Sequence, residues 1–254
     1  MRVIVLLSIL LGAAVPSSLQ AQEIDELVAR VASSVVGIGA LTKSLPQRGS
    51  QGPVRFFGSG FVLEGGGRVA SSWHVVDNEL GPTETLVVFA GQGQEVRAYA
   101  AQLAQVDRSH DLAILELVGA GNLHGLSLAD GALLAPGRSV AFTGFPTGIL
   151  GGIYPVTHRG MVSAIVPAAR PVRSAENLSA MQLRARKSGY MTYQLDAEVL
   201  PGQSGSPVYD IEKGKVVAVV QGSLSASSPL SDSKLPSRIS FAVPVRYLNA
   251  LLEP

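Results

Sequence analysis

Short apolar runs, separated by turns rich in glycine and proline, recur along most of this chain. A first set lies at 35–38, 56–63, 69–71, 85–90, 96–104 and 112–118. A second set lies at 139–143, 160–166, 191–195, 207–209, 216–221 and 239–243. Short apolar runs bounded by turn-forming residues are typical of β-strands. Two sets of six strands predict two antiparallel β-barrels, at about 34–120 and 137–245, with a connection over 119–136.

Two segments that flank this pattern have the periodicity of helices. Ile24, Leu27, Val28 and Val31 recur at the three- and four-residue spacing that places side chains on one face of a helix. The run at 245–252 is a second such segment, which we expect to form a short helix docked on the second barrel. The pattern therefore predicts an all-β protein with a short helix near each end.

The first residues have the composition of a secretory signal peptide. Arg2 supplies a positive charge, an apolar run extends from Val3 to Val15, and the small residue Ala21 marks a cleavage site. The run is short for a membrane span, and an uncleaved anchor is the alternative. We expect residues 1–21 to be removed and the mature protein, 22–254, to be exported without a membrane attachment.

Composition narrows the classes of function. Charged residues make up 15% of the 254 residues and the formal net charge is +1, so no nucleic-acid-binding surface is indicated. The chain has no cysteine, which excludes disulfides, a thiolate nucleophile and a cysteine-based metal site. An exported protein without disulfides fits a bacterial periplasmic or secreted protein. His124 and His158 lack metal-ligand spacing, and no metal or cofactor is predicted.

Ser204 lies in a glycine-rich turn, Pro201-Gly202-Gln203-Ser204-Gly205-Ser206-Pro207. Glycine adopts backbone angles that a β-carbon forbids, so Gly202 and Gly205 allow a sharp bend that exposes the serine hydroxyl. The same bend can direct the N–H groups of Gly202 and Ser204 toward one point, as an oxyanion hole requires. A hairpin turn that contains a serine by chance is the alternative.

A histidine and an aspartate precede this serine. His74 ends the apolar, strand-like segment Ser71-Ser72-Trp73-His74-Val75-Val76, and Asp111 stands just before the run at 112–118. The order His, Asp, Ser is that of the chymotrypsin-type proteases and differs from that of the subtilisins and the α/β-hydrolases. This order predicts Ser204 as nucleophile, His74 as general base and Asp111 as the group that orients the imidazole. Asp107 and His110 are rival candidates, and a structural role is the alternative for each member.

Five blocks of the chain resemble successive blocks of the HtrA/DegP branch of the chymotrypsin superfamily. They are Gly58-Ser59-Gly60-Phe61-Val62, Ser72-Trp73-His74-Val75-Val76, Asp111-Leu112-Ala113-Ile114-Leu115, Gly202-Gln203-Ser204-Gly205-Ser206-Pro207 and Ile239-Ser240-Phe241-Ala242-Val243-Pro244. The resemblance implies a chymotrypsin-like double barrel, a serine protease domain over 22–254, protein or peptide substrates and no cofactor. It favours Asp111 over its rivals. Trimers are common in this branch, and the sequence leaves the oligomeric state open. The PDZ domains usual in HtrA proteins are not expected here.

The resemblance also places a substrate pocket. Glu198 lies near its floor, and Val220 and Gly222 lie in one wall. A buried Glu198 carboxylate would favour lysine or arginine side chains. If Glu198 points to solvent, a pocket walled by Val220 would accept small aliphatic side chains, which is the interpretation preferred here. Gln203 stands where chymotrypsin-type zymogens have an aspartate, so activation by a new N-terminal amine is not expected. Trp73 replaces a small residue and is expected to pack beneath its loop.

Two classes of function follow from these observations. The first is an exported serine endopeptidase that acts on exposed or unfolded protein segments. The second is a catalytically silent double barrel that serves as a binding or chaperone-like module. The complete triad favours the enzyme. The basic segment 168–190 is expected to be a solvated loop beside the cleft, with an anion-binding patch as the alternative.

Overall fold

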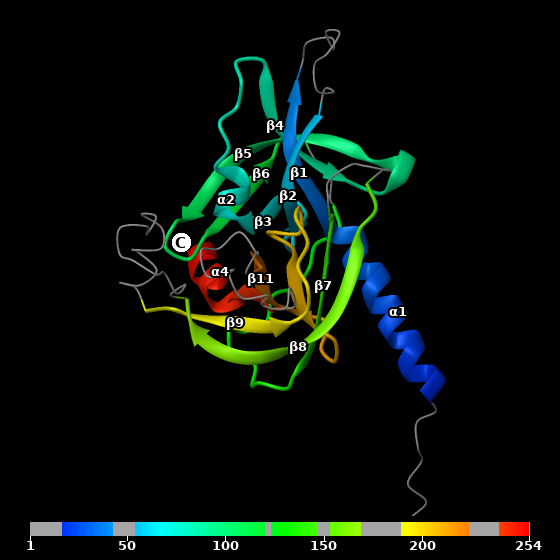
Figure 1. Cartoon of the computed structure of the whole chain (residues 1–254). Helices are drawn as coiled ribbons and strands as arrows, with labels where there is room; N and C mark the ends of the chain where they lie inside the picture. The colour runs from blue at the N-terminus through cyan, green and yellow to red at the C-terminus, as the bar shows by residue number, and fades with distance from the viewer. Residues whose placement is uncertain are drawn as a thin grey trace, which may run out of the picture.

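Two closed barrels of six antiparallel strands contain most of the chain that the computed structural model describes (Figure 1). The described residues are 17–42, 54–119, 123–146, 153–168, 189–223 and 239–253. The first barrel comprises β1 (Val35–Thr42), β2 (Val54–Val62), β3 (Arg68–Ser72), β4 (Glu84–Ala90), β5 (Arg97–Asp107) and β6 (Leu112–Leu117). The second comprises β7 (Ser139–Gly144), β8 (Val156–Pro167), β9 (Met191–Asp196), β10 (Pro207–Asp210), β11 (Val216–Ser223) and β12 (Ile239–Pro244). The predicted double barrel is confirmed.

Both barrels have the same topology. The strand order is β1-β2-β3-β6-β5-β4 in the first barrel. In the second barrel it is β7-β8-β9-β12-β11-β10, so each strand has the same place as its counterpart in the first. Pairing of β1 with β4, and of β10 with β7, closes each sheet on itself. Closure leaves no unpaired edge strand, because every strand has a neighbour on both sides.

The strand β6 shows why some of these strands read as continuous apolar runs. Successive side chains of a strand point to opposite faces of the sheet. Leu112 and Ile114 belong to the large apolar cluster shared by the two barrels, whereas Leu115 and Leu117 belong to the core of the first barrel. Both faces of β6 are therefore covered, and the strand lacks the polar alternation of a surface strand.

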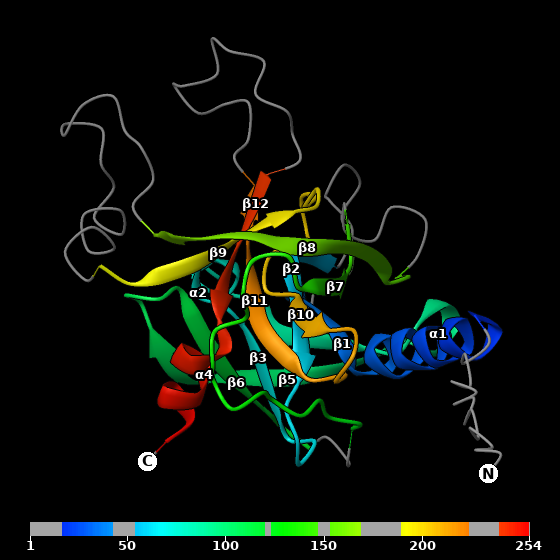
Figure 2. The same cartoon turned by 90° about the horizontal axis from the view of Figure 1, so that it is seen from below.

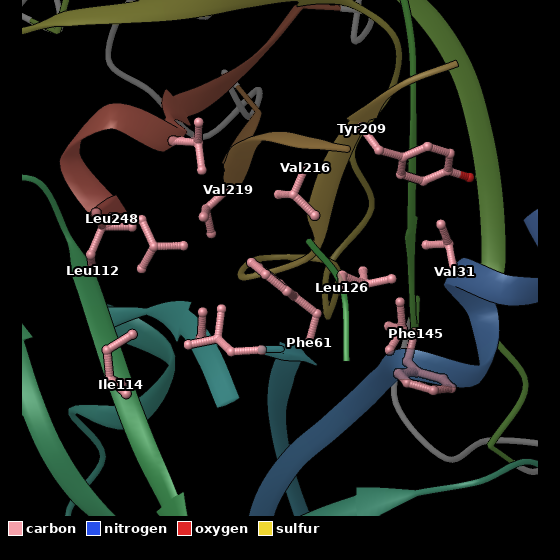
Figure 3. Close-up of a cluster of buried hydrophobic side chains, with 14 of the residues drawn as sticks. Val31, Phe61, Leu112, Ile114, Leu126, Phe145, Tyr209, Val216, Val219 and Leu248 are labelled. Carbon is pink, nitrogen blue, oxygen red and sulfur yellow. The ribbon is translucent and has the colours of Figure 1, made fainter. Parts of the chain in front are cut away.

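The large apolar cluster fixes the two barrels against each other (Figure 3). Phe61 and Ile114 enter it from the first barrel, Val219 from the second and Leu248 from the C-terminal helix. These four side chains are fully buried. Truncating a large core side chain to alanine costs about 2–5 kcal/mol, so a shared cluster of this kind resists separation of the barrels. Residues far apart in the sequence can then hold fixed positions at the interface.

The described residues also form four helical segments: α1 (Ser17–Ser34), α2 (Trp73–Val76), the 3₁₀ turn η1 (Gly93–Glu95) and α4 (Val245–Leu252). Leu27 and Val31, which the spacing placed on one face of a helix, pack into the shared cluster. The two terminal helices lie on opposite sides of the barrels, and α1 projects outward (Figures 1 and 2). In the described residues, no helix combines the length and apolar character needed to cross a membrane.

Several elements differ from the sequence-based expectation; β1, for example, ends at Thr42 instead of 38. Helix α1 starts at Ser17, before the helix expected from the apolar spacing, and runs without a break past the expected cleavage position after Ala21. Strand β8 starts at Val156 instead of 160, because polar residues such as Thr157 pair with β7 although they interrupt the apolar pattern. His74 lies in a one-turn helix instead of a strand end. Residues 1–16 of the expected signal peptide lie outside the described residues.

Candidate active site

His74 and Asp111 form a pair of hydrogen bonds at the edge of the first barrel. The Nδ1 atom of His74 lies 2.7 Å from Oδ2 of Asp111, and the backbone N–H of His74 donates to Oδ1 at 2.9 Å. Asp111 is only 3% exposed, whereas the His74 side chain is 40% exposed. A carboxylate at Nδ1 favours the tautomer that carries its proton there, which leaves Nε2 as a hydrogen-bond acceptor. The predicted acid and base are therefore brought together.

The backbone of Asp111 has an unusual conformation. Its φ angle is 57°, in the left-handed region that aspartate tolerates better than most residues other than glycine. The carbonyl of Asp111 accepts a hydrogen bond from the Trp73 N–H at 3.0 Å, so the turn is held against the start of α2. The carboxylate reaches His74 from this turn, immediately before β6 begins at Leu112.

Trp73 is packed in the manner expected from the sequence. It is 9% exposed, and the guanidinium carbon of Arg108 lies 5.0 Å from the centre of its ring. The tryptophan therefore lies against the turn that carries Asp111.

Ser204 lies in the predicted turn between β9 and β10. Gly202 and Gly205 have φ angles of 93° and 85°, which side chains other than glycine rarely adopt. The N–H of Ser206 donates to the Gln203 carbonyl at 3.1 Å and closes the turn around Ser204. The N–H of Gly205 donates to the Val220 carbonyl at 2.8 Å and ties the turn to β11.

The turn reaches across to the first barrel. The Ser204 carbonyl accepts a hydrogen bond from the Ser59 N–H on β2 at 2.9 Å. Gly58 lies between the turn and α2: a Cβ atom there would be 2.9 Å from both methyl carbons of Val75 and 3.1 Å from the Ser204 carbonyl oxygen. Val75 follows His74, so the serine turn and the histidine helix are separated by little more than a glycine backbone.

The hydroxyl of Ser204 donates a hydrogen bond to the Gln221 carbonyl at 3.1 Å. Within the described residues, no hydrogen bond joins it to His74. The N–H groups of Gly202 and Ser204, the predicted oxyanion donors, likewise have no hydrogen-bond partner among the described residues. The structure therefore pairs His74 with Asp111 and brings Ser204 near α2, with the serine hydroxyl turned to β11.

Gln203 supports the same turn from inside. It is fully buried, and its Oε1 atom accepts a hydrogen bond from the Leu200 N–H at 2.9 Å. Its Nε2 atom is buried and has no partner in the described part of the chain. The side chain is neutral and is bonded within its own turn.

The predicted pocket residues lie in different surroundings. Glu198 is exposed, whereas Val220 is fully buried in the core of the second barrel. Gly222 follows a register shift in the β11–β12 pairing and has a φ angle of 151°. Burial lowers the pKa of the nearby His158 imidazole, and the charge of Glu198 offsets part of this effect. His158 is therefore neutral at pH 7, and its ring stacks on Phe142.

The rival candidates form a pair of their own. Oδ2 of Asp107 lies 2.5 Å from Nδ1 of His110, and Oδ1 accepts the N–H groups of Ser109 and His110. The His110 ring stacks on Tyr247 of α4 at a centroid distance of 4.1 Å. His110 thus connects the turn that carries Asp111 to the C-terminal helix. The sequence indicates Asp107 and His110 only as alternative members of the triad.

Three buried serines at the barrel interface were given no role by the sequence. The Ser59 hydroxyl donates to the Gly202 carbonyl at 2.7 Å, and that of Ser71 donates to the Ser59 carbonyl at 2.7 Å. The Ser72 hydroxyl donates to the Val220 carbonyl at 2.9 Å. A signal was present, since Ser59, Ser71 and Ser72 interrupt apolar strands, but the partners of Ser59 and Ser72 lie 143 and 148 residues away in the sequence.

In the segments that the structure describes, no three His, Asp or Glu side chains are grouped closely enough to bind a metal ion. His124 contacts the Ser34 hydroxyl through Nδ1 at 3.2 Å. Most of the basic segment, 169–188, lies outside the described residues.

Comparisons with known proteins agree with this architecture. The family model of the trypsin-like peptidase domain matches residues 58–219. Mitochondrial serine protease HTRA2 of Drosophila virilis is 28% identical over 231 residues, which cover 91% of this chain and 47% of that protein. HTRA2 of Drosophila grimshawi is also 28% identical, over 91% of this chain and 46% of that protein. The chain therefore spans about half the length of the curated relatives that it matches.

Solved structures show the same fold. The HtrA-type protease AlgW with a decapeptide has a TM-score of 0.64 and 20% identity, over 90% of this chain and 66% of that chain. The resemblance to HtrA proteins that the five sequence blocks indicated is confirmed.

Proposed function

Because this chain belongs to the trypsin-like peptidase domain family, we propose that it is a serine endopeptidase in which Ser204 is the nucleophile. His74 would accept the hydroxyl proton through Nε2 and return it to the leaving amine. Asp111 would hold the imidazole and stabilise its charged form. The observation that carries the proposal is the two-point contact of the buried Asp111 carboxylate with the ring and the backbone of His74.

The oxyanion of the tetrahedral intermediate would be bound by the N–H groups of Gly202 and Ser204. Both lack a protein partner in the described chain, which leaves them available to a substrate oxygen. Preorganised donors of this kind usually give the largest electrostatic contribution to acyl transfer. Before attack, the Ser204 hydroxyl must rotate from the Gln221 carbonyl toward His74. Catalytic hydrogen bonds are often absent from substrate-free sites and form in the complex.

Exposed or unfolded protein segments are the proposed substrates. The similarity in fold to an HtrA-type protease solved with a decapeptide supports peptide or protein substrates. We propose that the protein acts after export, with residues 1–21 as the signal peptide. An exposed Glu198 supports a preference for small aliphatic side chains over lysine and arginine.

This preference predicts a small effect of Glu198→Gln. A carboxylate in solvent is screened and contributes little to selection of a cationic side chain. The ratio of kcat/KM for matched peptides with valine or lysine before the scissile bond should change less than about fivefold, since exposed ion pairs contribute at most about 1 kcal/mol. A fall of tenfold or more in lysine cleavage would instead place Glu198 in the pocket.

The hydrogen bond from Ser204 to Gln221 favours one other function, a silent double barrel that binds proteins without cutting them. In that case the hydroxyl would stay bound to β11, and His74 would never reach its proton.

Reaction with a fluorophosphonate probe tests the two functions. Attack of the Ser204 oxygen on phosphorus forms an O–P bond and expels fluoride, and the hydroxyl proton passes to His74. We expect covalent labelling of the purified protein, strong reduction in His74→Ala, and no labelling of Ser204→Ala, which lacks the reacting oxygen. Intact mass spectrometry gives the stoichiometry, and circular dichroism shows that each variant is folded. A folded wild type that neither labels nor cleaves unfolded casein would contradict the endopeptidase proposal.

A further inference from the structure

Ser59 on β2 makes an unusual set of contacts with the nucleophile turn. Its side chain is fully buried. Its hydroxyl donates to the Gly202 carbonyl at 2.7 Å and accepts a hydrogen bond from the Phe145 N–H at 2.9 Å. Its N–H donates to the Ser204 carbonyl at 2.9 Å. One residue of the first barrel therefore contacts the turn at two carbonyl groups on either side of Gln203.

The Gly202–Gln203 peptide group is held at both ends. Ser59 binds its carbonyl oxygen, and its N–H, which belongs to Gln203, donates to the Leu200 carbonyl at 3.1 Å. A planar peptide group with both polar atoms bonded cannot turn about its axis without breaking a buried hydrogen bond. The Gly202 N–H belongs to the preceding Pro201–Gly202 peptide, which is the central peptide of the turn that the bond from Gln203 to Leu200 closes. Glycine itself places few limits on its backbone angles, so the closed turn and the bond that holds the Gly202 carbonyl restrict the direction of this N–H.

The contacts of Ser59 are themselves braced. The Ser71 hydroxyl donates to the Ser59 carbonyl at 2.7 Å, so β3 holds Ser59 in place from the first barrel. Phe145 anchors the hydroxyl from the end of β7. A buried hydroxyl that both donates and accepts has one favourable orientation, and linked hydrogen bonds strengthen one another.

From these contacts we propose that Ser59 is a positioning residue: its hydroxyl fixes the Gly202–Gln203 peptide so that the Gly202 N–H points into the oxyanion hole. The inference rests on the proposed endopeptidase function and deepens it. Ser59 does not touch the substrate. Its effect reaches the reaction only through the direction of one N–H group, which matters most when the carbonyl oxygen becomes negative. Loss of the hydroxyl should therefore reduce kcat more than it raises KM.

Ser59→Ala tests this role. We expect kcat for a peptide substrate to fall about 10- to 100-fold, less than the loss of an oxyanion donor itself, with KM changed less than about threefold. Hydrogen–deuterium exchange should be faster in the peptide that covers residues 200–206. Ser59→Cys keeps a side chain of similar size with a weak donor and should retain an intermediate kcat. The protein has no other cysteine, so the new thiol cannot form an intramolecular disulfide.

Thr192→Val is the matched control for stability. The Thr192 hydroxyl is also buried and donates to a carbonyl, that of Ala242, at 2.7 Å within the β9–β12 pairing. Its loss should lower Tm but leave kcat within twofold of wild type. If Thr192→Val and Ser59→Ala lose activity in proportion to their Tm values, Ser59 acts only through stability and the inference fails. It also fails if a folded Ser59→Ala retains kcat within twofold.

The outcomes separate this inference from the proposed function. An inactive wild type overturns the endopeptidase function, and exchange in residues 200–206 then decides the role of Ser59 by itself. Unchanged exchange in Ser59→Ala would show that the hydroxyl does not hold the turn. If Ser59→Ala does not fold, Ser59→Cys decides: wild-type kcat with wild-type exchange overturns the inference, and a lower kcat with faster exchange supports it.

Discussion

Replacing Asp111 with asparagine is expected to lower kcat about 10⁴-fold without unfolding the protein. The asparagine oxygen can still accept the His74 N–H, the bond that Oδ1 now makes at 2.9 Å. Its amide N–H₂ group would then face Nδ1, where Oδ2 now lies 2.7 Å away. Two donors cannot share a hydrogen bond, so the imidazole must move its proton to Nε2. In that tautomer His74 cannot accept the proton of Ser204.

Peptide hydrolysis under substrate saturation measures this effect, and Tm shows that the variant remains folded. Asp107→Asn is a matched control, because Asp107 also pairs with a histidine Nδ1 and with backbone N–H groups in the same turn. Its kcat should stay within about fivefold of wild type, since surface and part-buried contacts away from the reacting atoms contribute modestly. The reverse pattern, with Asp107→Asn inactive and Asp111→Asn active, would move the triad assignment to the Asp107–His110 pair.

Much of the fold could be predicted from apolar runs and turns alone. In each barrel four of the six pairings join consecutive strands, so local pattern and chain order together indicate much of the topology, whereas the pairings β1–β4, β3–β6, β7–β10 and β9–β12 do not follow from them. The helix α4, at Val245–Leu252, has the predicted bounds. The start of β8 was placed too late, because Thr157 and His158 are polar and do not continue the apolar run, although both pair with β7. The strand propensity of a segment does not show which other strand it pairs with.

The catalytic residues of the site could be predicted where a short sequence pattern marks them, but the contacts between the two barrels could not. Ser204 and Asp111 stand beside turns that the chain itself encodes, and the structure brings Asp111 to His74. The contacts of Ser59 with Gly202 and of Ser204 with Gln221 depend on how two barrels meet. Serine occurs in many surroundings, so its type alone does not reveal a buried donor. Such contacts follow from tertiary packing.

Gly205→Ala is the second large effect that the structure predicts. A Cβ atom at this position would lie 2.1 Å from the Ser59 carbonyl oxygen and 2.3 Å from the Ser71 hydroxyl oxygen. Atoms that are not bonded to each other cannot lie this close. The Ser59 carbonyl belongs to the backbone of β2 and cannot easily shift, so the serine turn must move away from the first barrel. A displacement of about 1 Å at a reacting group can cost 10²-fold, and loss of an oxyanion donor a further 10²-fold or more. We expect kcat/KM to fall at least about 10³-fold.

Gly65→Ala separates the collision from backbone strain. Gly65 has a φ angle of 96°, close to the 85° of Gly205, but a Cβ atom there would meet nothing within 4 Å. Both variants bear the same cost of a left-handed alanine, about 1–2 kcal/mol, and only Gly205→Ala pushes the two barrels apart at Ser204. Gly65→Ala should therefore lower Tm with kcat/KM near that of wild type. Equal activity in the two variants would mean that the serine turn does not depend on its close contact with β2, and the positioning of the nucleophile by the first barrel would have to be abandoned.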